Sequence, residues 1–188
     1  MHNDQSLLRK DGLAARRSLT IDERDVGSEL IAEKVVHAHW FQRSKYVACY
    51  LAAADEVNTW AIISRAWRMK KRVFAPVLGK TRRMQFQEIT PDTELIRNEL
   101  GLLEPIDGDI AVARMFDIVF TPLAAFDETL QRIGMGGGYF DRTFAFTRHR
   151  MHWQRPRMIG LAFACQKVAK IPPNPWDIRV FTVITEEA

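Results

Sequence analysis

Phe116-Asp-Ile-Val-Phe-Thr121 is the most strand-like segment of this 188-residue chain, and Pro122 ends it. A nearly continuous apolar run of this length is typical of a parallel strand that is buried on both faces. Further apolar segments of strand length lie at residues 46–51, 72–77, 158–164 and 180–185. Strands alternate with helical segments through most of the chain. We therefore predict an α/β fold, a mainly parallel open sheet with helices on both faces, in a single domain spanning residues 1–188.

The segments between the strands show helix signals. Residues 6–17 are predicted to form a short basic helix, and residues 60–69 form another. Thr20-Ile-Asp-Glu23 is a capping box that opens a helix extending to about His39. The buried stripe of that helix is predicted to be Val26, Leu30, Ile31 and Val35. Pro76 and Gly79 are expected to stop the strand at 72–77, and residues 91–98 to form one or two helical turns.

Composition and charge narrow the class of protein. The chain is 47% hydrophobic and 27% charged, which is ordinary for a globular protein. It has no apolar run of membrane-spanning length and no N-terminal signal segment, so we expect a cytoplasmic protein with no membrane partner. Cys49 and Cys165 lie in apolar segments and are interpreted as buried, reduced thiols. The formal charge of +4 suits a polyanionic small molecule or a nucleic acid equally.

Four of the ten glycines fall within residues 134–138 of the stretch Arg132-Ile-Gly-Met-Gly-Gly-Gly-Tyr-Phe-Asp-Arg142. Unhindered backbone N–H groups followed by a helix N-terminus form a site for phosphate, and residues 139–148 can form that helix. The stretch is neither a Walker A motif, since no Gly-Lys-Ser/Thr closes it, nor a dinucleotide fingerprint, since Tyr139 replaces the third glycine. A carboxylate such as Asp141 beside such a loop suits Mg²⁺. A phosphate-binding loop with a nearby Mg²⁺ site favours phosphoryl transfer as the reaction.

Two further segments are candidates for the site. Asp55 and Glu56 follow the strand at 46–51, and ligands of open α/β sheets bind beyond the carboxyl ends of strands. The alternative is that both are acids favoured near the start of the next helix, with Asn58 or Thr59 as its cap. The basic helix at 6–17 is either a solvated charged face or an arm laid across the phosphate site.

The stretch Thr121-Pro-Leu-Ala-Ala-Phe-Asp-Glu-Thr-Leu-Gln-Arg-Ile-Gly-Met-Gly-Gly-Gly-Tyr-Phe-Asp-Arg142 resembles the signature of the 5-formyltetrahydrofolate cyclo-ligase family, also called methenyltetrahydrofolate synthetases. The resemblance extends over nearly the whole chain, through Leu8-Arg9, Asp55-Glu-Val-Asn-Thr59, Lys71-Arg-Val, Gly101-Leu-Leu-Glu-Pro105 and Trp176-Asp177. It implies an ATP- and Mg²⁺-dependent ring closure of 5-formyltetrahydrofolate to 5,10-methenyltetrahydrofolate. ADP and phosphate are released, and the formyl oxygen is phosphorylated on the way.

The resemblance also implies roles for individual residues. Arg132 and Tyr139 are the implied catalytic pair, and Asp141 and Asp177 are the implied Mg²⁺ ligands. The implied ATP-binding residues are Arg9, Lys10, Arg132, Gly134, Met135, Gly136, Gly137, Gly138, Tyr139 and Phe140. The implied folate-binding residues are Leu51, Glu56, Met135, Gly136, Gly137, Gly138 and Tyr139.

Four positions depart from the family pattern. Gln5 stands where relatives often carry a phosphate-binding lysine, which Lys10 would have to replace. Gly137 replaces a lysine, so positive charge at the loop must come from Arg132, Arg142 or the N-terminal helix. Leu130 replaces a glycine, and Leu100 replaces an aromatic residue expected near the folate.

Two other classes of protein compete with this interpretation. A non-catalytic RNA-binding protein would explain the charge, but the chain lacks an aromatic RNA-binding motif and would leave the acidic pair unexplained. A sugar-phosphate isomerase could use a glycine-rich loop without ATP. We expect a monomeric enzyme that binds small molecules and no nucleic acid.

Overall fold

The computed structural model describes residues 2–148 and 155–187, and its centre is a seven-stranded sheet. The strand order is β11-β10-β7-β1-β2-β3-β6. The strands are β1 (Tyr46–Ala48), β2 (Arg72–Leu78), β3 (Met84–Ile89), β6 (Ile110–Ala111), β7 (Ile118–Pro122), β10 (Arg157–Leu161) and β11 (Thr182–Ile184). The strands from β11 to β2 run parallel, whereas β3 and β6 are antiparallel additions at one edge. The predicted α/β fold with a mainly parallel sheet is confirmed.

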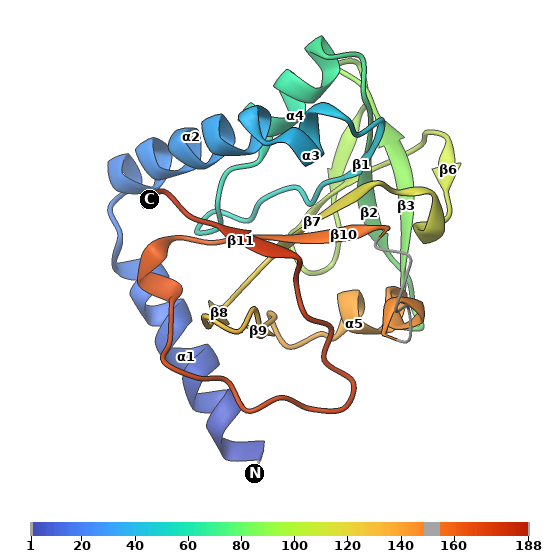
Figure 1. Ribbon diagram of the computed structural model, residues 1–188. Helices are drawn as coiled ribbons and strands as arrows, with labels where there is room; N and C mark the ends of the chain where they lie inside the picture. The colour runs from blue at the N-terminus through green and yellow to red at the C-terminus, as the bar shows by residue number, and fades with distance from the viewer. Residues whose placement is uncertain (1, 149–154, 188) are drawn as a thin grey trace.

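Helices and two small hairpins surround this sheet. The helices are α1 (His2–Ser18), α2 (Ile21–His37), α3 (His39–Gln42), α4 (Trp60–Arg68) and α5 (Tyr139–Thr143). The hairpins pair β4 (Leu95–Arg97) with β5 (Leu103–Pro105) and β8 (Ala125–Phe126) with β9 (Arg132–Ile133). Figure 1 shows α2, α3 and α4 on one side of the sheet, and β8, β9 and α5 on the other. No helix within the described ranges has the length and apolar character needed to cross a bilayer.

The alternation of side chains along the strands divides the core into two parts. On β7, Ile118 and Phe120 pack in the cluster that includes residues of α2 and α4, whereas Val119 between them packs in the opposite cluster. That second cluster joins the sheet to Phe144, which follows the short helix α5. Both faces of the sheet are therefore covered, which explains the unbroken apolar pattern of residues 118–120.

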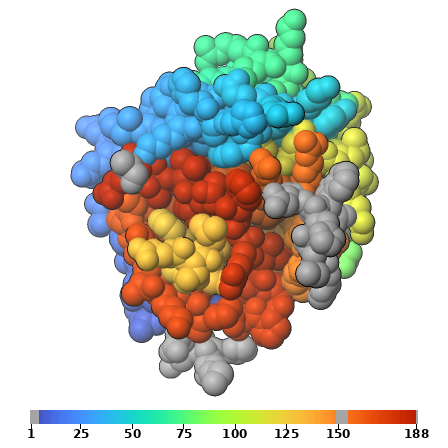
Figure 2. Space-filling view, in the orientation of Figure 1, coloured from blue at the N-terminus to red at the C-terminus, as the bar shows by residue number. Residues whose placement is uncertain are grey.

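The segment between β10 and β11 closes around the β8–β9 hairpin. The backbone N–H of Val168 donates to the carbonyl of Phe126, and that of Val180 donates to the carbonyl of Leu130. Asp127 accepts the N–H of Ile171 at 2.8 Å. Figure 2 shows the resulting surface, with the residues near 130 enclosed by C-terminal segments. The hairpin is fixed at the position from which it presents the glycine-rich stretch.

Helix α1 crosses the β8–β9 hairpin at close range. A side chain at Gly12 would collide with the carbonyl oxygen of Ala124, so only glycine permits this approach. One stripe of α1, at spacings of four, three and four residues, carries Gln5, Arg9, Gly12 and Arg16. The polar members of this stripe reach Asp177, Gly134 and Asp55.

The structure corrects several local predictions in α2 and β2. The capping box at Thr20 and Glu23 is confirmed, but Val26 and Leu30 are exposed, and Gly27, Ser28 and Ala32 are buried beside Ile31 and Val35. The close contact of Gly27 with the ring of Phe163 rotates the helix this way. Strand β2 continues through Pro76. Its pairing with β1 ends at Phe74, so no strand lies where the missing N–H of Pro76 would be needed.

Two other predictions were wrong. Residues 91–98 contain strand β4 rather than a helical turn, because they pair with residues 103–105 across a turn at Asn98 to Gly101. Cys49 is buried as predicted, and burial raises the pKa of its thiol to about 12. Cys165 is exposed, since it lies in a 3-10 turn after β10 has ended.

Candidate functional site

The glycine loop, residues 134–138, connects strand β9 to helix α5. Gly136 and Gly138 have φ angles of 103° and 65°, in the left-handed region that favours glycine. Gly138 is the N-cap of α5, which is a single short helix of 5 residues. The guanidinium Nε of Arg9 donates to the carbonyl of Gly134 at 2.9 Å, so the N-terminal helix is tied directly to the loop.

A polar cavity of about 310 Å³ lies between the glycine loop, α1 and the segment before β11. Its charged lining consists of Arg9, Arg132, Arg142, Arg148, Asp141 and Asp177. Four guanidinium groups against two carboxylates leave the cavity with an excess of positive charge. A polyanion is the ligand that such a lining favours.

Arg132 is the buried cation of this cavity. Its side chain is 3% exposed, and Nη2 donates to Oδ1 of Asp141 at 2.8 Å. Within the described part of the chain, Nε of Arg132 has no hydrogen-bond partner. A buried N–H group without a partner is energetically unfavourable. Phosphate oxygens would satisfy it, so the residues present fit the phosphates of a nucleotide.

Asp141 and Asp177 line the same cavity although they are far apart in sequence. Oδ1 of Asp141 accepts from Arg132, and Oδ2 of Asp177 accepts the N–H of Asn174 at 2.8 Å and Nε2 of Gln5 at 3.0 Å. The second oxygen of each carboxylate has no hydrogen bond or ion pair to any described residue. The described residues contain no group of three or more His, Cys, Asp or Glu side chains that could hold a metal. Two carboxylates nevertheless fit Mg²⁺, which takes most of its ligands from phosphate and water.

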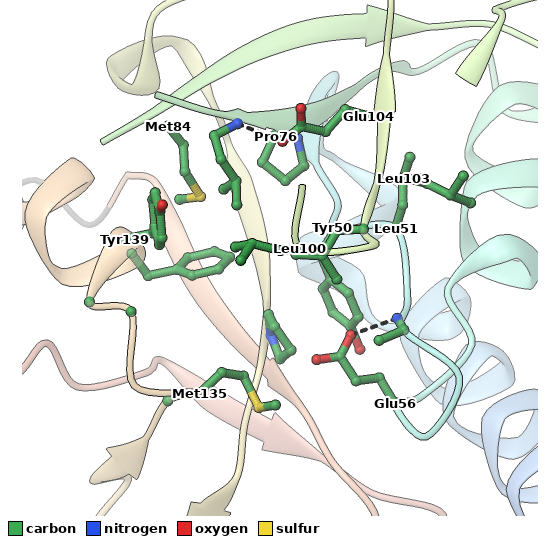
Figure 3. Close-up of a pocket in the computed structure, with 18 of the residues that line it drawn as sticks. Tyr50, Leu51, Glu56, Pro76, Met84, Leu100, Leu103, Glu104, Met135 and Tyr139 are labelled. Carbon is green, nitrogen blue, oxygen red and sulfur yellow. Dashed lines mark hydrogen bonds between the residues drawn. The ribbon is translucent and has the colours of Figure 1, made fainter. Parts of the chain in front are cut away.

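A second, apolar cavity of about 280 Å³ lies on the other side of the glycine loop (Figure 3). Its floor comes from the carboxyl ends of three parallel strands: Tyr50 and Leu51 follow β1, Pro76 and Leu78 end β2, and Pro122 ends β7. The β4–β5 hairpin, the glycine loop and the start of α5 provide the walls, with Leu100, Leu102, Leu103, Met135, Tyr139 and Phe140. This is the position at which open α/β sheets bind ligands.

Glu56 is one of three carboxylates that line the apolar cavity, with Glu104 and Asp141. It is 9% exposed, and Oε2 accepts the N–H of Ala53 at 2.9 Å, which folds the side chain back over its own turn. Burial raises the pKa of Glu56, and the Ala53 N–H and the charge of Arg16 offset only part of that rise. Oε1 accepts no hydrogen bond from a described residue, so it is available to a ligand donor.

The start of α4 is organised by Asn58 and Thr59, the two residues expected there. The N–H of Trp60 donates to the side chain of Asn58 at 3.0 Å, whereas Thr59, the N-cap residue, makes no side-chain capping bond. The Thr59 hydroxyl donates instead to the carbonyl of Tyr50 at 2.7 Å. Glu56 takes part in neither of these bonds, and its Oε2 is held by the N–H of Ala53.

Most of the candidate residues converge on the two cavities. Leu51, Glu56, Met135, Gly137, Tyr139 and Phe140 line the apolar one, and Arg9, Gly136, Asp177 and Gln5 line the polar one. Arg132, Gly134, Gly138 and Asp141 line both. Lys10 is exposed and lines neither cavity, and Gln5 contacts Asp177.

The structure also explains three departures from the family pattern. Leu130 has a φ of 63°, a conformation that favours glycine. At Gly137, Arg142 donates to the carbonyl oxygen at 2.7 Å and supplies positive charge there. Leu100 lies at the tip of the β4–β5 hairpin, is 65% exposed, and still lines the apolar cavity.

Sequence reasoning missed the role of Arg16. Its side chain is 1% exposed and lies beneath the Asp55–Glu56 turn, with Nη2 donating to Oδ2 of Asp55 at 2.9 Å. The signal was the helical spacing from Arg9, which places both arginines on the inner stripe of α1. Arg148 of the polar cavity carries no comparable signal, because it follows the single 3-10 turn Ala145–Thr147 rather than a continuous α-helix.

Comparisons with known proteins agree with this geometry. The 5-formyltetrahydrofolate cyclo-ligase family model matches residues 1–186. The chain is 35% identical over 176 residues to the 5-formyltetrahydrofolate cyclo-ligase of Escherichia coli (strain K12), covering 90% of this chain and 93% of that protein. It is 31% identical over 175 residues to the Haemophilus influenzae protein of the same name, covering 90% of each.

A solved structure shows the same fold. The NMR structure of the Aquifex aeolicus 5,10-methenyltetrahydrofolate synthetase matches with a TM-score of 0.82 at 27% identity, covering 98% of this chain and 90% of that one. A family match over nearly the entire sequence, relatives above 30% identity and a shared fold lead to one conclusion. This chain belongs to the 5-formyltetrahydrofolate cyclo-ligase family of enzymes.

Proposed function

We propose that this protein uses ATP and Mg²⁺ to close 5-formyltetrahydrofolate to 5,10-methenyltetrahydrofolate, with release of ADP and phosphate. One observation carries the proposal: the apolar and polar cavities meet at the glycine loop and share Arg132, Gly134, Gly138 and Asp141. A flat heterocycle in the first cavity and a triphosphate in the second would bring their reacting atoms together at this wall. Proximity of this kind is the main means of accelerating phosphoryl transfer.

The chemistry follows from the poor leaving ability of an amide-like formyl oxygen. The γ-phosphoryl group moves from ATP to that oxygen and ADP departs. The N10 lone pair then attacks the formyl carbon, the C–O bond breaks, and phosphate leaves with the oxygen while N10 loses its proton. The five-membered ring is closed, and phosphate has replaced an unfavourable leaving group.

The residues divide the work according to their positions. Arg132 lies at the shared wall, where its buried charge would stabilise the phosphoryl group in transfer, and Tyr139 would orient the folate beside it. Glu56 would accept hydrogen bonds from the donor edge of the pterin, and Leu51 and Met135 would pack on its ring. Asp141 and Asp177 would hold Mg²⁺, which neutralises phosphate charge when bound. Arg9 and the N–H groups of residues 134–138 would bind the nucleotide.

The decisive test is whether ATP turnover depends on 5-formyltetrahydrofolate. We expect ADP release and the absorbance of the methenyl product to appear together, and only when ATP, Mg²⁺ and the folate are all present. ATP hydrolysis at the same rate with and without the folate would contradict the proposal. A sugar-phosphate isomerase or an RNA-binding protein would produce no methenyl chromophore.

A further inference from the structure

The buried side chain of Arg16 contacts several separate parts of the site. Nη2 donates to Asp55, and Nη1 lies 4.0 Å from Oε1 of Glu56. Nη1 is also 3.4 Å from the carbonyl of Leu123 and 3.9 Å from the sulfur of Met135 in the glycine loop. One buried guanidinium of α1 therefore joins the turn after β1, the end of β7 and the glycine loop.

The charges around Glu56 show what this guanidinium does. The groups that face the carboxylate are Arg16 from α1, Asp55 in the same turn, and the buried phenol of Tyr50. Burial and the charge of Glu56 raise the pKa of Tyr50 further, so the phenol stays neutral. Asp55 repels Glu56, and Arg16 is the single cation among these three groups. A buried carboxylate beside another carboxylate takes up a proton unless a cation compensates.

We infer that Arg16 is a positioning residue that keeps Glu56 ionised and directed into the apolar cavity, and thereby makes folate binding insensitive to pH in the neutral range. The inference rests on the proposed function, because it takes the pterin edge as the ligand of Glu56. Only the ionised carboxylate presents acceptors on both oxygens. Protonation would place a donor against the donor groups of the pterin.

The test compares the folate KM of wild type, Arg16→Met and Arg16→Lys across a pH series. In Arg16→Met, Glu56 is protonated at a higher pH, so the folate KM should rise by about tenfold or more near pH 6 and return toward the wild-type value near pH 9. The ATP KM should not follow this profile. Arg16→Lys keeps the charge and should restore most of the flat profile.

Arg17→Met is the matched control. Arg17 also contacts Asp55, through Nε at 3.2 Å, but its side chain is 66% exposed and does not contact Glu56. Its removal should leave the pH profile of the folate KM unchanged. An Arg16→Met profile that is raised equally at every pH, or that equals wild type, would overturn the inference, since a merely structural arginine would act alike at all pH values.

A measurement without ligand separates this inference from the proposed function. Unfolding free energies of wild type, Arg16→Met, Glu56→Gln and the double variant form a cycle that reports the coupling of the two side chains. We expect Glu56→Gln to stabilise the Arg16→Met protein more than it stabilises wild type, increasingly as pH rises. Absence of that coupling would overturn the inference even if the enzyme binds folate. Intact coupling in a protein that does not bind folate would instead count against the proposed function.

Discussion

The carboxylate of Glu56 opposes the folding of the turn that holds it, because burial raises its pKa. Replacement of Glu56 by Gln keeps the size of the side chain and exchanges one acceptor for a donor. We expect the folate KM to rise by about 10- to 100-fold while the ATP KM changes little, because a site built for donors loses affinity when mispaired. An unaltered folate KM in steady-state assays would show that the pterin does not contact Glu56.

Gly138 combines a strained backbone position with a place in the wall between the cavities. Its φ of 65° is unfavourable for alanine by about 1–2 kcal/mol, and a methyl group would press on the guanidinium of Arg142. Gly138→Ala should lower the melting temperature and raise the ATP KM by about tenfold.

Gly101 offers the matched control for this variant. Its φ is 75°, and a methyl group there would have no neighbour within 4 Å. Gly101→Ala should therefore lose similar stability with an unchanged ATP KM. Equal ATP KM values for both variants would mean that Gly138 serves the backbone alone.

At the scale of elements, Asp141 at the start of α5 and Asp177 before β11 meet across the polar cavity. Replacement of either by Asn removes the charge of a proposed Mg²⁺ ligand but retains a hydrogen-bonding side chain. We expect kcat to fall and the magnesium concentration for half-maximal activity to rise by about tenfold in each variant. Folate binding should persist.

Both aspartates also stabilise the fold, because Asp141 pairs with Arg132 and Asp177 accepts the N–H of Asn174. The Asn variants should therefore be less stable by about 1 kcal/mol. A loss of stability therefore does not distinguish the two roles. The magnesium titration does: an unchanged titration in both variants would remove the metal assignment and leave the two contacts as the whole function of these residues.

The sequence predicts elements well where a pattern is long or stereochemically specific. The capping box at Thr20, the apolar run of β7 and the glycine loop before α5 all lie where they were expected. Failures occur where a partner outside the segment decides the outcome. Residues 95–97 become a strand because residues 103–105 pair with them, and α2 buries Gly27 because Phe163 packs on it. Neither partner lies within the segment whose structure it decides.

The same distinction applies to the site. Glu56 and the glycine loop follow from rules about strand ends and phosphate, whereas Pro76, Leu78, Leu102 and Pro122 of the apolar cavity do not. These residues belong to no recognisable motif, and their place in the cavity depends on the order of the strands in the sheet. Lys10 and Arg16 show the limit at single-residue resolution, because a difference of helix face decides that one is exposed and the other buried.

At the scale of the whole molecule, Glu56 makes stability depend on pH. Its pKa in the folded state is above the ordinary value of 4.5, so its contribution is fully present below that pH and is lost as pH rises through the folded pKa. Glu56→Gln removes this loss. We expect the variant to gain stability relative to wild type as pH rises from 4.5 through the folded pKa of Glu56. Urea unfolding over a pH series measures the difference.

Asp55 provides an internal comparison with the opposite sign. Burial alone would raise its pKa, but hydrogen bonds from Arg16 and Arg17 outweigh burial and hold the pKa below 3.8. Its contribution to stability is therefore present at neutral pH and lost in acid.

A stability difference between Glu56→Gln and wild type that does not vary with pH would contradict the raised pKa of Glu56.

The hydrogen bonds of Gln5 to Asp177 and Pro172 join residues that are 172 and 167 positions apart. Contacts at such separation are slow to form, because the intervening chain must be ordered before they repay its lost entropy. During synthesis the first helix must wait for nearly the last segment before the polar cavity exists. The same contacts should be among the first to open on warming. ATP bound in the polar cavity would bridge α1, the glycine loop and the Asp177 turn. It would therefore stabilise these contacts and slow hydrogen exchange near both ends of the chain.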